Sequence, residues 1–379
     1  MICETVERAI RLARLDAILV WPSGVETLDD QVRKRIRRAG AEVHLWLPVL
    51  ADAGTEPPEE EQTEDAWGAR GHGASGSWRG LGSGDESFLF ACPRSRRWAD
   101  AARERIHKEA PLYDGVFLDR IRYPSPANGF ESLFTCFCPR CLAREPEAAL
   151  WRERIRQLRK RIESASDRDV DGWKSFDALL AESGLDDFRE SRSRAVRDMA
   201  AALAAEIRAA GKAVGLDLFT PAIAPLAGQE YRVLAPLGDW IKPMSYCHAK
   251  GPAGLPLELA SFVRGMKAWG RGADEKTIAA FAGRSFGGFN LPESADRIES
   301  HGLDECVAGG EFWAAADMAG GNVYPGFECV RHPDFDLDMD ARGVGRYLDA
   351  LSGAPGLVLA WNILYTPEEF LRLAAEGRQ

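Results

Sequence analysis

The sequence predicts an α/β protein in which eight parallel strands, each followed by a helix, close into a (β/α)8 or TIM barrel. Short, nearly continuous apolar runs recur along the chain, and amphipathic helical patterns separate most of them. The length of 379 residues is sufficient for eight such units. An open doubly wound sheet is the alternative, but it favours a phosphate-binding loop after the first strand, where the sequence has none.

The predicted elements follow one another in a regular order. We expect strands at residues 16–22, 42–48, 87–93, 114–124, 213–221, 239–246, 321–328 and 356–365. We expect helices at 27–39, 95–110, 188–210, 256–269 and 341–352. Together they predict a single barrel over 1–379, with a polar, glycine-rich loop at 53–86 and a second insertion at 125–187. The first insertion follows a strand on the face where barrel active sites lie, so we interpret it as a candidate lid.

Charge and composition limit the partners of the protein. The chain has 48 lysines and arginines against 58 aspartates and glutamates, which gives a net charge of −10 and disfavours nucleic acid and anionic membranes. No apolar run reaches the ~18–20 residues of a membrane span, and no secretory signal is visible. We therefore expect a cytoplasmic protein with a small-molecule or oligosaccharide substrate, and we leave a homo-oligomer open.

Three cysteines, Cys136, Cys138 and Cys141, lie within six positions in the segment FTCFCPRCLA. In the cytoplasm, clustered thiols bind metal or perform redox chemistry more often than they form disulfides. Three thiolates leave one position of a tetrahedral zinc ion unfilled, and Cys92 at the end of the preceding predicted strand is the best donor for it. Four thiolates leave no open position, so we expect a structural zinc that fastens the insertion to the barrel.

The stretch CPRSRRWADAARERI, the run DGVFLD and the cluster CFCPRC together resemble the strand 3 to strand 4 region of family 42 glycoside hydrolases, which are β-galactosidases. Members of that family carry a CP-x-S stretch, a strand 4 motif and a C-x-C-x2-C zinc cluster on a TIM barrel. The resemblance covers roughly residues 87–145, about a sixth of the chain. It implies a carbohydrate-active barrel that holds zinc at the cysteines.

The sequence departs from that family at the end of strand 4. In the family this strand ends with an Asn-Glu pair whose glutamate is the acid/base, whereas this chain has Asp119 and Arg120. The run DGVFLDRIRYP looks more like the strand 4 of uncharacterised glycosidase-like barrel proteins, in which the aspartate is the expected functional group. The resemblance therefore implies a distant relative of the glycoside hydrolases with its chemistry centred on Asp119.

Carboxylates and aromatic side chains gather at the predicted strand ends, where the active site of a barrel lies. Cleavage of a glycosidic bond normally needs two carboxylates. We expect Asp119 to be nucleophile or base, because arginines lie beside it, and Glu328 to be the acid, with Asp217 as the substitute for either. The expected substrate-binding residues are Trp21, Trp46, Arg122, Tyr123, Lys242, Tyr246, His248, Tyr324, Trp361 and Asn362.

The sequence leaves two other functions open. Because the family's glutamate is missing at strand 4, the barrel could be catalytically inactive and bind carbohydrate or a protein. Alternatively, Lys242 could form a Schiff base, as a lysine of an aldolase or lyase does. A glycoside hydrolase is the function that the strand-end residues favour most.

Overall fold

The computed structural model describes residues 2–73, 87–251, 253–333 and 336–377. Its centre is a curled sheet of seven parallel strands in the order β1-β2-β3-β4-β5-β6-β9. The strands are β1 (Ala17–Val20), β2 (Glu42–Pro48), β3 (Gly115–Asp119), β4 (Ala213–Phe219), β5 (Trp240–Met244), β6 (Gly326–Glu328) and β9 (Val358–Ala360). The curled parallel sheet confirms the predicted barrel class.

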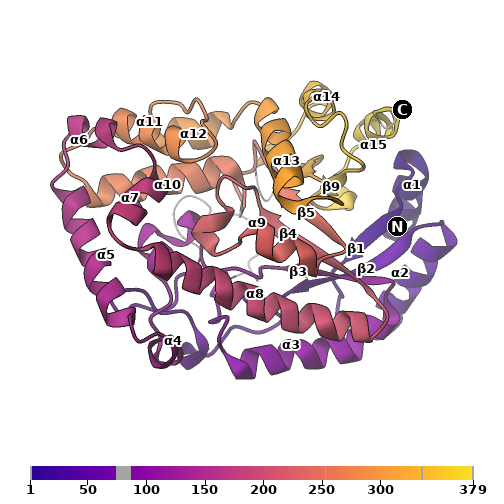
Figure 1. Cartoon of the computed structure of the whole chain (residues 1–379). Coiled ribbons are helices and arrows are strands. Elements are labelled where there is room, and N and C mark those ends of the chain that lie inside the picture. The colour runs from indigo at the N-terminus through magenta and orange to yellow at the C-terminus, as the bar shows by residue number, and fades with distance from the viewer. Residues whose placement is uncertain (1, 74–86, 252, 334–335, 378–379) are drawn as a thin grey trace.

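Helices cover the outside of this sheet (Figure 1). They are α1 (Ile2–Ala13), α2 (Glu26–Arg38), α3 (Arg96–Glu109), α8 (Asp186–Ala209), α9 (Tyr231–Leu234), α10 (Leu255–Trp269), α11 (Glu275–Ser285), α12 (Ala295–His301), α13 (Cys306–Ala319), α14 (Ala341–Ala350) and α15 (Glu368–Glu376). The five helical patterns predicted from the sequence are therefore confirmed to within a few residues. No described helix combines the length and the apolar character that crossing a bilayer requires.

One predicted strand is wrong. Residues 87–93 form no strand of the sheet, and β2 pairs directly with β3 from His44 opposite Gly115 to Pro48 opposite Asp119. The apolar run lies instead beyond the ends of these strands, where Ala91 donates its backbone N–H to Leu50 at 2.7 Å. Phe88, Phe90, Ala91 and Cys92 of this run are buried, and burial of that kind produces the same sequence pattern as a central strand.

The two edge strands of the sheet, β1 and β9, are brought together by helices (Figure 1). No backbone ladder joins β1 to β9 within the described ranges. Instead, Ala9 and Ala13 of α1 are buried against Leu371 of α15, with Leu359 of β9 packed on the same cluster. Side-chain packing therefore closes the seam, and both chain ends lie on this side of the molecule.

The second insertion forms the wall farthest from the chain ends (Figure 1). It contains η4 (Pro126–Asn128), η5 (Phe130–Phe134), α4 (Pro139–Arg144), α5 (Ala148–Glu163), α6 (Asp167–Gly172) and α7 (Phe176–Glu182). In the first insertion, Trp67 packs edge-on against Trp269 of α10 and Phe134. Residues 74–86, which include much of the predicted lid, lie outside the described residues, so the lid stays a prediction.

The inside of the sheet is filled rather than open. Phe117 of β3 stacks on Trp240 of β5 with ring centroids 4.9 Å apart. Between them β4 carries Gly215, where an added Cβ would lie 2.4 Å from the Trp240 ring. These rings form a floor one layer below the strand ends, as packed layers do in barrels of this class.

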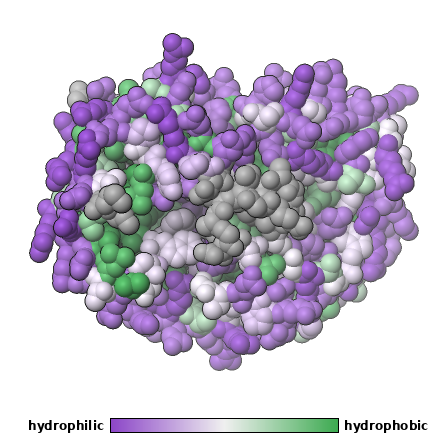
Figure 2. Space-filling view, turned by 180° about the vertical axis from the view of Figure 1, so that it is seen from behind, coloured by the Kyte–Doolittle hydropathy of each residue, from purple (hydrophilic) through white to green (hydrophobic). Residues whose placement is uncertain are grey.

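The outer surface is mainly hydrophilic in the view of Figure 2, in keeping with the charged residues of the sequence. Apolar side chains gather at the left of that view, the side on which α1, α2 and α15 lie in Figure 1. Among the described residues, Trp21, Val25 and Leu28, at or just before the start of α2, are exposed large apolar side chains.

Candidate active site

Two aspartates lie side by side at the carboxyl ends of β3 and β4. Leu118 of β3 pairs with Leu216 of β4, so the next residues along, Asp119 and Asp217, are neighbours across the two strands. Both side chains are buried, with 6% and 3% of the residue exposed. Parallel strands lie about 4.8 Å apart, so the fold itself places these two carboxyl groups together.

Both carboxyl oxygens of Asp119 accept hydrogen bonds. Its Oδ1 accepts the Arg120 backbone N–H at 2.5 Å, and its Oδ2 accepts the Trp46 indole Nε1–H at 2.9 Å. The Arg120 Nε lies 3.6 Å from the same Oδ2. A carboxyl group that only accepts hydrogen bonds beside a guanidinium is stabilised as a carboxylate.

Asp217 lies in a different environment. Its Oδ2 forms a 3.0 Å ion pair with Lys242 of β5, whereas its buried Oδ1 accepts no hydrogen bond from any described residue. Burial raises the pKa of Asp217 to about 7, because it outweighs the attraction of Lys242 and acts together with the repulsion from Asp119. Asp217 therefore exchanges a proton near neutral pH, as a catalytic acid or base must.

Aromatic rings border the aspartates on two sides. Trp21 is 39% exposed and meets Trp46 edge-on with centroids 5.3 Å apart. On the other side, Tyr246 lies 4.8 Å from Trp361, and the Lys242 ammonium lies 5.4 Å from the Tyr246 ring. The structure therefore brings the predicted Trp21, Trp46, Lys242, Tyr246 and Trp361 to the same rim as the aspartates.

Glu328 is placed differently from the two aspartates. It is completely buried, and its carboxylate accepts the backbone N–H groups of residues 247, 248 and 249 at 3.3, 2.8 and 2.7 Å. It also accepts the hydroxyl of Tyr347 from α14. These four donors occupy the carboxylate, so Glu328 anchors the loop after β5 to the end of β6.

Four other predicted residues have contacts with groups other than the two aspartates. Arg122 is buried between the rings of Phe90 and Phe219, at 4.5 and 4.6 Å, and burial lowers its pKa to about 10. Tyr123 is buried against Arg192. Tyr324 precedes β6, and its ring contacts Trp240 at the start of β5. Asn362 follows β9 and caps the short helix η9 (Ile363–Tyr365).

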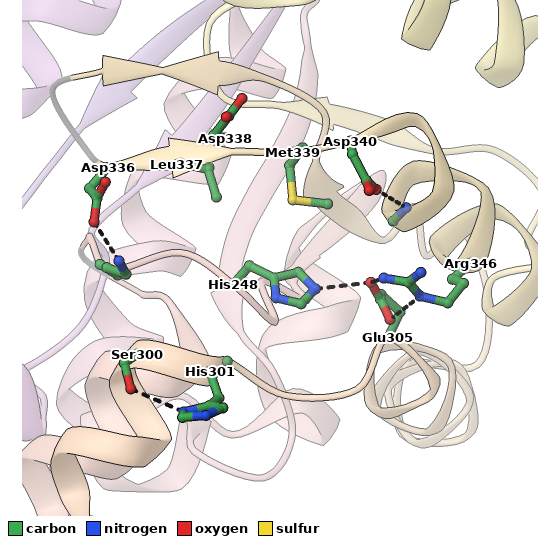
Figure 3. Close-up of a pocket in the computed structure, with 13 residues that line it drawn as sticks. His248, Ser300, His301, Glu305, Asp336, Leu337, Asp338, Met339, Asp340 and Arg346 are labelled. Atoms are coloured by element: carbon green, nitrogen blue, oxygen red, sulfur yellow. Dashed lines mark hydrogen bonds and ion pairs between the residues drawn. The ribbon is translucent and has the colours of Figure 1, made fainter.

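His248, in the loop after β5, lines a separate groove of about 340 Å³. Figure 3 shows its ring directed toward Glu305, which a bidentate contact from Arg346 of α14 also holds. The short hairpin of β7 (Arg331–His332) and β8 (Leu337–Asp338) borders the groove. None of the three candidate carboxylates lines it, so the groove and the strand-end site are distinct.

Sequence reasoning missed two neighbours of Arg120, the residue that contacts Asp119. Asp52, four residues beyond the end of β2, accepts the Arg120 Nη1–H at 2.8 Å, and the Arg120 guanidinium lies 4.3 Å from the Phe88 ring. Asp52 could have been found by including the first four residues after each predicted strand among the candidates. Phe88 could not have been found in this way, because its segment was assigned to a strand.

The four predicted metal ligands converge. The sulfur atoms of Cys92, Cys136, Cys138 and Cys141 are buried and all lie within 4.8 Å of one another. Cys92 lies 3.6 Å from Cys141 and 3.7 Å from Cys138. With Zn–S bonds of about 2.3 Å, the edge of a tetrahedral site is about 3.8 Å, so the donor set fits a metal ion such as zinc. Burial raises the pKa of Cys136, and a bound cation would counter this by favouring the thiolate.

Comparison with solved structures supports the fold. Over 99% of its length the chain matches the glycoside hydrolase domain of PgaB (BpsB) from Bordetella bronchiseptica, with 14% identity, 90% of that chain covered and a TM-score of 0.53. A class V chitinase from Pseudomonas fluorescens Pf-5 matches at 9% identity, with 99% and 96% of the two chains covered and a TM-score of 0.50.

Gan42B, a GH42 β-galactosidase from G. stearothermophilus, matches the whole chain at 12% identity with a TM-score of 0.50. The chain spans about half of Gan42B, 53% of its length. No protein-family model matches the sequence, and no curated protein matches it. At these identities the matches establish a glycoside hydrolase-like barrel fold, and they agree with the resemblance to family 42.

Proposed function

We propose that the protein is a glycoside hydrolase in which Asp119 and Asp217 are the catalytic pair. The observation that carries this proposal is their adjacency at the ends of β3 and β4, with opposite environments. The Asp119 carboxylate accepts hydrogen bonds at both oxygens. The Asp217 carboxyl group is buried, and its Oδ1 accepts no hydrogen bond from any described residue. Environments that separate two carboxyl groups in this way assign one as acid and one as anion.

Each residue then has a defined part in the reaction. Asp217, whose pKa is raised to about 7 by burial, protonates the leaving oxygen through Oδ1. Asp119 attacks or stabilises the anomeric carbon, while Trp46 and Arg120 keep it oriented. The separation of the two carboxyl groups decides the stereochemical outcome, because ~5–5.5 Å is typical of retaining enzymes and ~6.5–9.5 Å of inverting ones.

The aromatic rim supports a carbohydrate substrate. Trp21 is exposed but fixed, because Trp46 supports it at its edge and the Arg120 guanidinium lies 5.8 Å from its ring. Rings held in this way present a flat apolar surface, which suits the C–H face of a pyranose. Beyond Lys242, the partly exposed ring of Trp361 supplies a similar surface, and the buried Tyr246 ring supports it at 4.8 Å.

A catalytically inactive carbohydrate-binding barrel is the second candidate. The observation in its favour is the buried Lys242–Asp217 ion pair, which gives Asp217 a structural partner. A Schiff base at Lys242 is less favoured. Burial lowers the pKa of Lys242, but Asp217 more than compensates, so the pKa is raised and the amine stays a non-nucleophilic ammonium.

The proposal is tested with aryl glycosides of several sugars, comparing the wild type with Asp119→Asn. We expect the variant to lose about 100- to 10,000-fold in kcat. Asp349→Asn, at an exposed position of α14, is the matched control and should keep full activity. Equal turnover by the wild type and Asp119→Asn would rule out the pair, and sugar binding without any product would favour the inactive barrel. NMR of the first-formed anomer distinguishes retention from inversion.

For the cysteine cluster, we propose one structural zinc ion per chain. Cys92, Cys136, Cys138 and Cys141 would hold it and leave no open position, so it would stabilise the fold and take no part in the chemistry. Elemental analysis should find one zinc per chain, and Cys92→Ser should lower that content. A metal-free protein with four titratable thiols at these positions would exclude the metal site.

A further inference from the structure

The segment from Phe88 to Cys92 connects the cysteine cluster with the surroundings of Asp119. Three of its residues, at alternate positions, contact three different groups. The Phe88 ring lies 4.3 Å from the Arg120 guanidinium, and the Phe90 ring lies 4.5 Å from that of Arg122. Cys92, two positions further on, is one of the four clustered thiols.

Backbone hydrogen bonds tie the same segment to the strand ends. Ala91 donates to Leu50 at 2.7 Å, and Leu50 donates to the carbonyl of Arg120 at 3.3 Å. At the other end of the segment, Cys92 donates to Glu61 at 2.8 Å. Arg120 is therefore linked to this short segment in two ways. The Phe88 ring contacts its guanidinium, and Leu50 connects its carbonyl to the backbone of Ala91.

Arg120 in turn bears on the catalytic carboxylate. Its backbone N–H and guanidinium both face Asp119, and its Nη1 binds Asp52. Asp52 also accepts the backbone N–H of Phe88 at 3.3 Å. We call Asp52, Phe88 and Arg120 the arginine clamp.

All three residues of the arginine clamp have backbone conformations that are unfavourable for side chains other than glycine. Their φ angles are +47° at Asp52, +51° at Phe88 and +55° at Arg120. Such conformations cost energy and persist only where the surroundings impose them. The clamp therefore needs an anchor outside itself, and the four buried thiols lie at the end of the segment that carries Phe88.

We infer that the metal-loaded cysteine cluster holds the arginine clamp in place, so that metal binding controls the orientation of Asp119 from outside the active site. In this arrangement Phe88 is a positioning residue that acts through Arg120. The effect on catalysis rests on the proposed function. The link between the cysteine cluster and the arginine clamp depends only on the packing of residues 88–92, so it can be tested without any activity.

The first experiment follows backbone hydrogen exchange, which reports local opening whether or not a substrate is known. We expect Cys92→Ser, or chelation of the wild-type protein, to speed exchange at the amides of Leu50, Ala91 and Arg120 by at least tenfold, while α10 keeps its protection. Cys306→Ser replaces an exposed cysteine outside the cluster and should change neither metal content nor exchange. Unchanged exchange at these three amides after metal loss would overturn the inference.

A second pair of variants leaves every thiol in place. Phe88→Leu should retain the metal but speed exchange at Leu50 and Arg120 by on the order of tenfold, because it removes a buried cation–π contact. Phe90→Leu, which faces Arg122 instead, should leave exchange at Leu50 unchanged. Equal effects of both variants at Leu50 would contradict a specific role for Phe88.

Activity separates this inference from the proposed function. On an active glycoside, Phe88→Leu should lower kcat with little change in KM, since the substrate-binding rings are untouched. If no glycoside is cleaved but exchange responds to the metal as expected, the proposed function fails and the coupling survives. If glycosides are cleaved and kcat does not respond to Phe88→Leu, the proposed function stands and the control of Asp119 by the cluster is overturned.

Discussion

The strands β4 and β6 each carry a buried carboxylate near the carboxyl end, and the two differ in how completely they are paired. Glu328 accepts hydrogen bonds from three backbone N–H groups and a tyrosine hydroxyl. Asp217 shares one oxygen with Lys242 and has no described donor at the other. Burial is nearly the same at both, so the hydrogen-bond partners distinguish an anchoring carboxylate from one that is available for chemistry.

The largest expected effect is on turnover. Asp217→Asn should lower kcat about 100- to 10,000-fold because the acid is lost. At pH 6 its cost in stability should be small, since Asp217 with a pKa of about 7 is mostly neutral there and an amide resembles the neutral acid. Kinetics and urea unfolding at pH 6 measure both. A variant that is strongly destabilised but retains the wild-type kcat in its folded fraction would show that Asp217 is structural and not catalytic.

Glu328→Gln should give the opposite pattern. Its amide would turn N–H groups toward the backbone donors of the loop after β5, so the free energy of unfolding should fall by about 1–3 kcal/mol. Turnover of the folded fraction should remain within the same order as the wild type. Loss of kcat at unchanged stability would return Glu328 to the catalytic pair, as the sequence first indicated.

The dependence of stability on pH sharpens the comparison further. The ordinary pKa of an aspartate, as in the unfolded chain, is 3.8, whereas burial raises the pKa of Asp217 in the folded chain to about 7. Between these values the folded chain holds a proton that the unfolded chain has released, so this contribution to stability falls as pH rises and levels off above about 7. Asp217→Asn should lack that slope in urea unfolding between pH 4 and 8. Parallel curves for the two proteins would show that the pKa of Asp217 is not raised.

The smallest expected effect concerns the aromatic rim. Trp21→Ala removes the exposed ring beside the pair and should raise KM roughly tenfold, which corresponds to a loss of about 1.4 kcal/mol of apolar contact with the substrate. Trp313 of α13 is also exposed, but it lies outside the strand ends, and Trp313→Ala is the control. Equal KM values for the two variants would remove Trp21 from the substrate site.

The parts of the site that could be predicted share one physical basis. Side chains at the carboxyl ends of parallel strands must lie on one rim, so Asp119, Asp217, Lys242 and Trp46 could be placed together from the sequence pattern alone. The spacing of three cysteines likewise indicated a cluster, and the predicted fourth member, Cys92, lies with them in the structure. In each case local spacing along an element determines the arrangement.

Other features could not be predicted, because they depend on contacts between distant segments. Residues 87–93 have the composition of a strand, yet they pack over β2 and β3 without joining the sheet. Tyr324 was expected at a strand end, but β6 begins two residues later, at Gly326, which leaves the ring beside Trp240. A shift of a few residues in a strand boundary moves a side chain to the other end of the barrel.

The sequence by itself determined the barrel class, five of the helices around it, the cysteine cluster and the set of strand-end carboxylates, because these follow from periodicity and spacing. Only the tertiary structure decided which carboxylate anchors a loop and which is free to exchange a proton. It also decided that Arg120 lies between Asp52 and Asp119. The physical reason is that the state of a buried charged group depends on its partners, and residues from distant parts of the chain supply those partners only after folding.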